Sequence, residues 1–333
     1  MLKYCIKRLL LSVLILFGVS VILYVLVRLM PTSYIDNLLQ GITTTGDVDY
    51  EKRKAELYVY YGLEENPTFR GLVSGYFSWL INFLKGDMGV SFKYNQPVED
   101  IIFENMGISF IISFVSLILQ LLIAIPLGIK CACNQYGKLD YTATVLTMIG
   151  ISFPTFFFGS LAIRVFALEL GWFPIGGLQS SMSVDATGWE IFIDKAWHLV
   201  LPMFVLVMLS IGSMMRYTRT NTLEVLNADY IRTARAKGLS ERTVVYKHAF
   251  RNTMIPLVTT LAGILPGLFG GSMITEQMFG IEGIGQTAYL AFKATDIPFI
   301  MGYNMFIAVL TVIGILLTDI MYAVVDPRVK LGK

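Results

Sequence analysis

The side chains that usually perform catalysis are sparse in this chain and poorly placed for it. His198 and His248 are far apart in the sequence, and Cys131 and Cys133 have no further cysteine or histidine close by to complete a metal site. The chain also lacks the Gly-x-x-x-x-Gly-Lys-Ser/Thr motif that cradles nucleotide phosphates. We therefore predict no catalytic residue, no metal ligand and no cofactor bound by this chain.

Polar residues inside long apolar stretches form a second group of candidates, because charge is costly there and suggests function. Arg164 lies about one turn from Glu169, which favours a structural ion pair over a contact with a ligand. Asp319 lies within another such stretch. Gln120 is expected to make a hydrogen bond between helices rather than to contact a transported solute.

The stretch 254–278 contains the residues that we expect to line a transport pathway. Its glycines permit an opening of the backbone, with the alternative that they only pack helices closely. Within the polar cluster that follows, Glu276 is expected either to meet a substrate amine or to lie in interfacial water. The candidate pathway residues are Gly267, Gly270, Gly271, Thr275, Glu276 and Gln277.

The elements that position these residues are predicted by an apolar composition. Of 333 residues, 55% are hydrophobic and only 15% are charged, whereas a soluble domain carries about a quarter charged residues. A helix needs about 20 apolar residues to cross the hydrocarbon core of a bilayer. This predicts an all-α polytopic membrane protein with six transmembrane helices at approximately 9–30, 108–129, 141–168, 199–215, 254–278 and 297–325, of which the fourth is the shortest.

Lysine and arginine concentrate in alternate loops, which predicts that both termini are cytoplasmic. The external segment is long enough for a small folded cap, with a helix-like stretch at 51–61 and an aromatic-rich stretch at 76–84. The expected organisation is an N-terminal anchor helix at 1–30, the external segment with short helices at 31–105, a five-helix core at 106–325 with a cytoplasmic loop at 217–253, and a cytoplasmic tail at 326–333.

The region 221–252 is a polar island between two apolar stretches. A short helix within it is expected to end at Gly238, a residue suited to a left-handed helix C-terminus. Its small residues favour docking of a partner, while a loop that only enforces topology or contacts anionic lipid stays open on physical grounds. The residues expected to share one apolar face are Tyr230, Ile231, Ala234 and Leu239.

The run DYIRTARAKGLSERTVVYKHAFRNTMIP, at 229–256, resembles the cytoplasmic signature loop of inner-membrane permeases of binding-protein-dependent ABC importers, specifically the B-type subunit of the oligopeptide, dipeptide and nickel group. Gly238 matches the glycine of that loop, and Ala234 is the retained residue of its Glu-Ala-Ala start. The resemblance covers nearly the whole chain through FLKGDMGVSF, ISFPTFFFG, LGWFPIGG, TEQMFGIEGIGQ and DIMYAVVDPRV. The sequence departs from the pattern of this family at 32–34 and 281–282. Both places are expected on the outer side, so the departures concern the substrate and the receptor rather than coupling to the ATPase.

This resemblance implies a type I ABC importer permease fold in the cell membrane of a prokaryote. It implies a non-catalytic subunit that forms half of a pathway for oligopeptides or dipeptides. The implied partners are a homologous second permease chain, two cytoplasmic ATPase subunits that hold ATP and Mg, an external substrate-binding protein and the lipid bilayer, with no nucleic acid. The residues implied in ATPase coupling are Ala228, Asp229, Tyr230, Ile231, Arg232, Thr233, Ala234, Arg235, Ala236, Lys237, Gly238 and Leu239.

The alternatives differ in cargo or in class. The same architecture is compatible with nickel chelates or oligosaccharides as cargo. An autonomous secondary transporter or channel predicts paired discontinuous helices or ionisable residues at the membrane midplane. An intramembrane enzyme requires a nucleophile, a base or a metal cluster within the spans, and the sequence offers none of their usual motifs.

Overall fold

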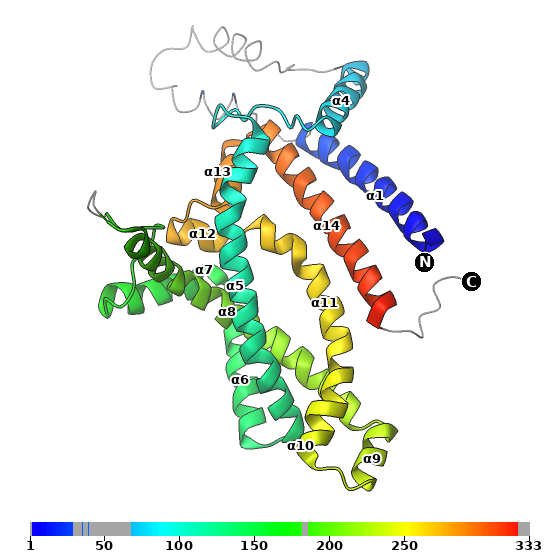
Figure 1. Ribbon diagram of the computed structural model, residues 1–333. Coiled ribbons are helices and arrows are strands. Elements are labelled where there is room, and N and C mark those ends of the chain that lie inside the picture. Colours follow the sequence, from blue (N-terminus) through cyan, green and yellow to red (C-terminus); the bar gives the residue numbers. More distant parts are fainter. Residues whose placement is uncertain (1, 29–34, 36–38, 40–67, 182–185, 326–333) are drawn as a thin grey trace.

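The computed structural model describes residues 2–28, 35, 39, 68–181 and 186–325, and the regular structure in these ranges is helical apart from one isolated bridge between Val90 and Pro97. The chain is an all-α, multi-pass membrane protein (Figure 1). In chain order the elements are α1 Leu2–Arg28, α4 Phe69–Leu84, α5 Val98–Cys133, α6 Lys138–Ser152, α7 Thr155–Ala162, η1 Ile163–Glu169, α8 Gly188–Leu226, α9 Asp229–Ala236, α10 Glu241–Thr243, η2 Val244–Ala249, α11 Phe250–Gly270, α12 Met273–Phe279, α13 Ile284–Ala294 and α14 Ile297–Val325.

Within the described ranges, four helices are long and apolar enough to cross a membrane, namely α1, α5, α8 and α14. A fifth is added if α6 and the following α7–η1 segment, which are bent by 103° relative to each other, count as one broken span. The 21-residue α11 occupies most of the stretch expected for the fifth predicted span. The six-span count and the orientation therefore stay predictions.

The centre of the molecule is the packing of α5 against α8, and α6 packs against both of these helices. A Cβ atom at Gly128 of α5 would lie only 2.7 Å from the carbonyl oxygen of Met215 in α8. A Cβ atom at Gly212 of α8 would lie 2.8 Å from Cβ of Thr147 in α6. Small residues that let helix backbones approach are typical of membrane helix pairs, and here they bring three helices into one stack.

The third predicted span, at 141–168, is not one straight helix. Helix α6 ends at Ser152, and Phe153 is extended with φ −82° and ψ 132° ahead of Pro154. A proline lacks an N–H donor and disfavours the helical conformation of the residue before it, which accounts for the break. The chain then continues as α7 and as the π-helix η1.

Two further predicted spans differ from the structure. The fourth, expected to be the shortest, is the 39-residue helix α8, which begins with a capping box of Thr187 and Glu190 and runs well into the predicted polar loop. The fifth ends at Gly270, since Gly271 adopts a left-handed φ of 71° and the separate helix α12 follows. Apolar composition extends across both α11 and α12, so it gave no sign of this turn.

At the end of the molecule that carries α4 and α13 (Figure 1), a buried carboxylate joins distant segments. Asp296, which is 0% exposed, caps α14 by accepting from Phe299 N at 3.2 Å. The same carboxylate accepts from Ser91 Oγ, from Phe92 N at 3.2 Å and from Lys93 N at 3.0 Å. The FLKGDMGVSF region is thereby fixed to the start of α14.

Of the two predicted external stretches, 76–84 lies in α4, whereas 51–61 lies outside the described residues. Tyr76 of α4 packs edge-on against Tyr24 of α1. The Tyr76 hydroxyl also lies 2.8 Å from the Oγ atom of Ser20, which is in α1 as well. Helix α1 also contacts α14, where Arg8 Nε lies 3.1 Å from Asp319 Oδ2. The charge within the last apolar stretch is thus paired with a charge near the start of the chain.

Candidate coupling helix and translocation cavity

The predicted short helix of the polar island is present as α9, at the end of the molecule opposite α4 and α13 (Figure 1). Its inner face is held by its own chain. Ile231 is 0% exposed and Ala234 is also buried, and both pack against Val244 and Ala249 of η2. Half-buried Val225 and Leu226 at the end of α8 complete this cluster.

The four residues expected to share one apolar face of α9 do not do so. Ile231 and Ala234 are buried, whereas Tyr230 is 48% exposed and Leu239 is also exposed. The short helix has a three-to-four residue repeat that places Ile231 and Ala234 together, but Tyr230 precedes that pair by one position and Leu239 follows the end of the helix. The surface available to a partner is consequently the opposite one, formed by Asp229, Tyr230, Arg232, Thr233, Ala236 and Lys237.

The C-terminal end of α9 has the geometry that its glycine predicts. Gly238 has φ +75°, a conformation in which any side chain is strained, and its N–H donates to the Arg235 carbonyl oxygen. Arg235 then pairs with Glu241 of α10, with its NH2 nitrogen 2.7 Å from Oε1. This hydrogen-bonded carboxylate raises the pKa of the Arg235 guanidinium above its usual value. The turn at Gly238 is thus held by a backbone hydrogen bond to Arg235 and by the ion pair of Arg235 with Glu241.

A continuous path of packed elements leads from α9 into the membrane helices. α9 contacts η2, η2 also contacts α8, and η2 continues directly into α11. Because packed cores move as units rather than deform smoothly, a displacement of α9 is expected to reach α8 and α11 together.

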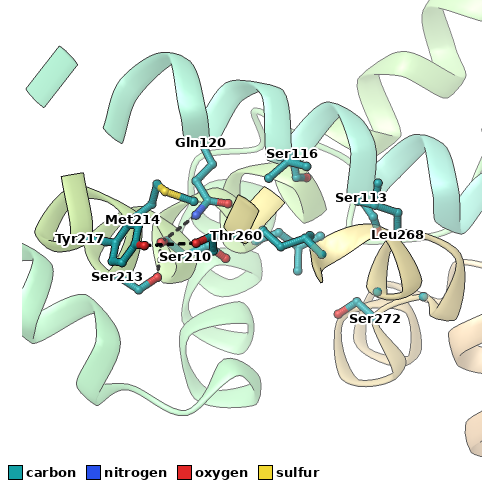
Figure 2. Close-up of a pocket in the computed structure, with 15 residues that line it drawn as sticks. Ser113, Ser116, Gln120, Ser210, Ser213, Met214, Tyr217, Thr260, Leu268 and Ser272 are labelled. Atoms are coloured by element: carbon teal, nitrogen blue, oxygen red, sulfur yellow. Dashed lines mark hydrogen bonds between the residues drawn. The ribbon is translucent and has the colours of Figure 1, made fainter. Parts of the chain in front are cut away.

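Helices α5, α8 and α11, together with the turn at Gly271 and Ser272, line an open cavity of about 600 Å³ (Figure 2). It contains most of the polar side chains that these three helices carry in their middle sections. The lining residues are Ser113, Ser116, Leu117, Gln120, Leu206, Ser210, Ser213, Met214, Tyr217, Thr260, Ile264, Gly267, Leu268, Gly271 and Ser272.

Hydrogen bonds at one end of the cavity tie the three helices together, as Figure 2 shows. Gln120 Nε2 of α5 donates to the Ser210 carbonyl oxygen of α8 at 3.0 Å, which confirms the interhelical hydrogen bond predicted for this residue. Thr260 Oγ1 of α11 donates to Tyr217 Oη of α8 at 3.4 Å. The cavity wall is therefore cross-linked by uncharged groups.

The predicted pathway residues separate into two sets. Gly267 and Gly271 line the cavity. Gly270 instead lies against α14, where its carbonyl oxygen accepts from Tyr303 Oη at 2.7 Å. Gln277 and the buried Thr275 lie in α12 and are not part of the cavity lining.

Glu276 is neither in the cavity nor in water, since it is 1% exposed. Its carboxylate accepts from Ser272 N at 2.8 Å and from Gln286 N, in the first turn of α13, at 3.1 Å. A Cβ atom at Gly283 or Gly285 would lie within 3.0 Å of this carboxylate, so glycines make room for it. Glu276 thus caps α13 from a neighbouring helix, where a negative charge is favourable.

The ion pair predicted for the third span is confirmed, with Arg164 Nε 3.1 Å from Glu169 Oε1 on an exposed surface. A second pair was not predicted: Arg219 of α8 donates to both oxygens of buried Asp140 in α6, at 2.6 and 2.7 Å. Among the described residues, no group of three or more His, Cys, Asp or Glu side chains is arranged to hold a metal ion.

The cavity residues of α5 and α8 were missed at the level of sequence, although a signal exists. Ser109, Ser113, Ser116 and Gln120 recur at intervals of four, three and four along an otherwise apolar helix. Ser210, Ser213 and Tyr217 repeat the same spacing in α8. This stripe marks one polar face on each helix, and all of these residues except Ser109 line the cavity.

Comparison with known proteins agrees with this architecture. Residues 124–331 match the model of a family described as the binding-protein-dependent transport system inner membrane component. The chain is 37% identical to the oligopeptide transport system permease protein AppB of Bacillus subtilis, over 99% of this chain and 100% of that protein. It is 35% identical to a putative peptide permease protein of Brucella suis, over 99% of each, and 30% identical to the dipeptide transport system permease protein DppB of Alkalihalophilus pseudofirmus, over 99% and 100%.

Proposed function

The chain belongs to the family of inner-membrane components of binding-protein-dependent transport systems, and from this we propose that it forms half of the pathway for oligopeptides or dipeptides in an ABC importer. It is a multi-pass permease of the prokaryotic cell membrane. The observation that carries the proposal is the pairing of two features in one chain, a polar cavity among membrane helices and a short exposed helix packed onto η2 and the end of α8.

The cavity supports the assignment of a pathway. Membrane helices have little reason to direct hydroxyl and amide side chains at each other across an open space unless a polar solute or water occupies it. Peptide cargo is supported by the names of the relatives above, and the nickel and oligosaccharide alternatives have no comparable support among them.

Helix α9 supports the assignment of energy coupling. The chain lacks a phosphate-binding loop of its own, so energy from ATP has to be delivered by separate subunits. In the proposed mechanism two cytoplasmic ATPase subunits bind ATP and Mg and close on each other, and one of them holds the exposed face of α9. Its motion passes through Ile231 and Ala234 into η2, α8 and α11, whose faces form the cavity. An external binding protein delivers the cargo, and a homologous second chain supplies the other half of the pathway.

The exposed face of α9 gives the sharpest test. Ala236 is exposed in the last turn of α9, so Ala236→Trp adds bulk on the docking side without entering the packed cluster. We expect the variant to lose co-purification with the ATPase subunits and to lower ATP-dependent peptide uptake in proteoliposomes at least tenfold. The matched control is Ala196→Trp, at an exposed alanine near the start of α8 and far from α9. This variant should keep both ATPase co-purification and peptide uptake.

Buried Ala234 is unsuitable for this test, because a large residue there disrupts packing within the chain. If Ala236→Trp assembles and transports like the Ala196→Trp control, α9 does not dock an ATPase. If the unaltered complex shows no ATP-dependent peptide uptake with its binding protein, the proposed function itself is wrong.

A further inference from the structure

The cavity between α5, α8 and α11 has a chemical character that the proposed function does not require. Its polar side chains are hydroxyls and one amide, from Ser113, Ser116, Gln120, Ser210, Ser213, Tyr217, Thr260 and Ser272. None of its lining residues carries a carboxylate, an ammonium, a guanidinium or an imidazole. Charged residues of α8 exist nearby in sequence, such as Arg216 and Arg219, but they are not part of the lining.

One side chain in the lining is poised for a ligand. Ser116 is only 6% exposed, and its Oγ has no hydrogen-bond partner in the part of the chain that the structure describes. A serine in a membrane helix normally satisfies its hydroxyl by donating to a backbone carbonyl of the preceding turn, as Ser213 does to Ser210 O at 2.8 Å. A buried hydroxyl without a partner is costly, and an occupant of the cavity removes that cost.

Gln120 is the second informative side chain. One N–H of its amide donates to Ser210 O, and its carbonyl oxygen and its other N–H have no hydrogen-bond partner among the described residues. A side-chain amide presents the same donor and acceptor as a peptide bond, and the two can pair with each other. Ser116 lies about one helical turn from Gln120 on the same face of α5.

We infer that this cavity binds the main-chain amide groups of a passing peptide through Ser116 and Gln120, and that it does not discriminate between peptides by the charge of their side chains. The inference rests on the proposed function and adds the chemistry of recognition to it. Uncharged hydrogen bonds contribute little net free energy each, so they allow the cargo to leave as well as to enter. A fixed charge in the cavity would hold peptides of opposite charge and repel those of like charge.

The concave shape favours cargo over a tightly packed protein partner at this place. Close membrane helix contacts use small residues that bring backbones together, as at Gly128 and Gly212. The cavity instead retains about 600 Å³ between three helices. That space accommodates a short stretch of peptide main chain.

The experiment places a charge in the cavity and measures which peptides it affects. The full complex, with its binding protein, is reconstituted with Gln120→Glu or Gln120→Lys, and uptake is measured at pH 8 for Ala-Ala-Ala, Ala-Glu-Ala and Ala-Lys-Ala. Each rate is divided by that of the unaltered complex for the same peptide, which cancels the preference of the binding protein. The matched control is Gln96→Glu, the same chemical change at an exposed residue outside the cavity.

We expect Gln120→Glu to lower uptake of Ala-Glu-Ala about tenfold more than uptake of Ala-Lys-Ala, and Gln120→Lys to reverse that order. Gln96→Glu should leave the three ratios equal. If both Gln120 variants change the uptake of the three peptides by the same factor, or leave all three uptake rates unchanged, cargo does not contact this cavity and the inference is overturned. Uptake by the unaltered complex would then show that the proposed function still stands.

A second pair of variants addresses a Gln120 variant that fails to assemble. Ser213 is an exposed cavity residue on α8, and Ser213→Asp should produce the same bias against Ala-Glu-Ala. Ser116→Ala tests the hydrogen bond without charge, and it should lower uptake of all three peptides equally, by about threefold to tenfold. Full activity of Ser116→Ala together with an unbiased Ser213→Asp would count against the inference in the same way.

Discussion

At the scale of single residues, two buried carboxylates, those of Glu276 and Asp296, serve as structural caps. Glu276 and Asp296 are each almost completely buried, and each accepts hydrogen bonds from backbone N–H groups in more than one segment. Both lie near the start of a helix, where the unpaired N–H groups and the helix dipole favour a negative charge. These backbone hydrogen bonds therefore account for the burial of both carboxylates, and neither carboxylate needs a bound solute to stabilise it.

The Asp296 cap predicts a specific loss of stability. Removing the carboxylate leaves the N–H groups of Phe92, Lys93 and Phe299 without their acceptor in a buried site. Asp296→Ala should lower the free energy of unfolding by about 2–4 kcal/mol, since buried donors lose a charged partner. A thermal unfolding curve of the purified complex in detergent measures this as a lower melting temperature.

The control is Glu104→Ala, at an exposed carboxylate on α5. Surface substitutions of this kind usually change stability by no more than about 0.5 kcal/mol. Equal melting temperatures for the two variants would contradict the structural role of Asp296.

Sequence reasoning identified Glu276 as important but assigned it to the wrong surroundings. A glutamate beside an apolar stretch gives no indication of whether backbone N–H groups will surround it, because those groups come from α13 and from the turn before α12. The Arg164–Glu169 pair was predictable since both partners lie on one short segment, whereas the Arg219–Asp140 pair joins two helices and was not.

At the scale of helices, backbone contact decides the arrangement more than apolar composition does. The all-helical class and most of the long helices follow from runs of apolar residues, and the structure contains them. The break at Pro154 and the turn at Gly271 lie inside such runs. A hydropathy pattern records how apolar a segment is, but it does not record whether the segment bends within the membrane.

The contact of α5 with α8 can be tested with a pair of glycines on one helix. At Gly128 an added methyl group would lie 2.7 Å from a carbonyl oxygen of α8, whereas at Gly107 nothing lies within 4 Å. Gly128→Ala should destabilise the protein by about 1–3 kcal/mol through overpacking. Gly107→Ala should be neutral or stabilising by up to about 1 kcal/mol, because alanine favours the helix.

Each variant adds one methyl group to a glycine of the same helix, so comparing their melting temperatures isolates the contribution of the contact at Gly128. The packing described for α5 and α8 requires Gly128→Ala to be the less stable of the two. The opposite order, or no difference, would contradict the close approach at Gly128.

At the scale of the whole molecule, the arrangement connects the end that carries α9 to the cavity through η2, α8 and α11. The exposed side of α9 is at one pole, the buried side of α9 packs on η2 and α8, and α8 and α11 both contribute to the cavity. Inward-open and outward-open states of a transporter differ in which side reaches such a cavity. The proposed coupling therefore predicts that water access to the cavity depends on nucleotide.

A cysteine at position 213 reports this access. In a complex whose native Cys5, Cys131 and Cys133 are replaced by serine, Ser213→Cys places a thiol in the cavity lining. We expect its rate of reaction with a membrane-impermeant maleimide to change at least fivefold between the nucleotide-free complex and the complex trapped with ATP and Mg. Leu122→Cys, on an exposed apolar face of α5, should react slowly in both.

Because Ser213 lines the cavity and Leu122 does not, the two labelling rates distinguish a change of cavity access from a general change of the fold. A rate that stays constant across nucleotide states would mean that the cavity does not alternate in access. A changed rate at Leu122 as well would point to a general loosening of the fold instead of coupling through α9.

The burial of Ile231 and Ala234 also bears on how such a complex is built in the cell. The inner face of α9 is already covered by the same chain, so the helix is formed before any partner arrives and docking does not have to order it. Under the proposed coupling, the order in which the subunits are synthesised need not be strict, because this chain alone covers the inner face of α9.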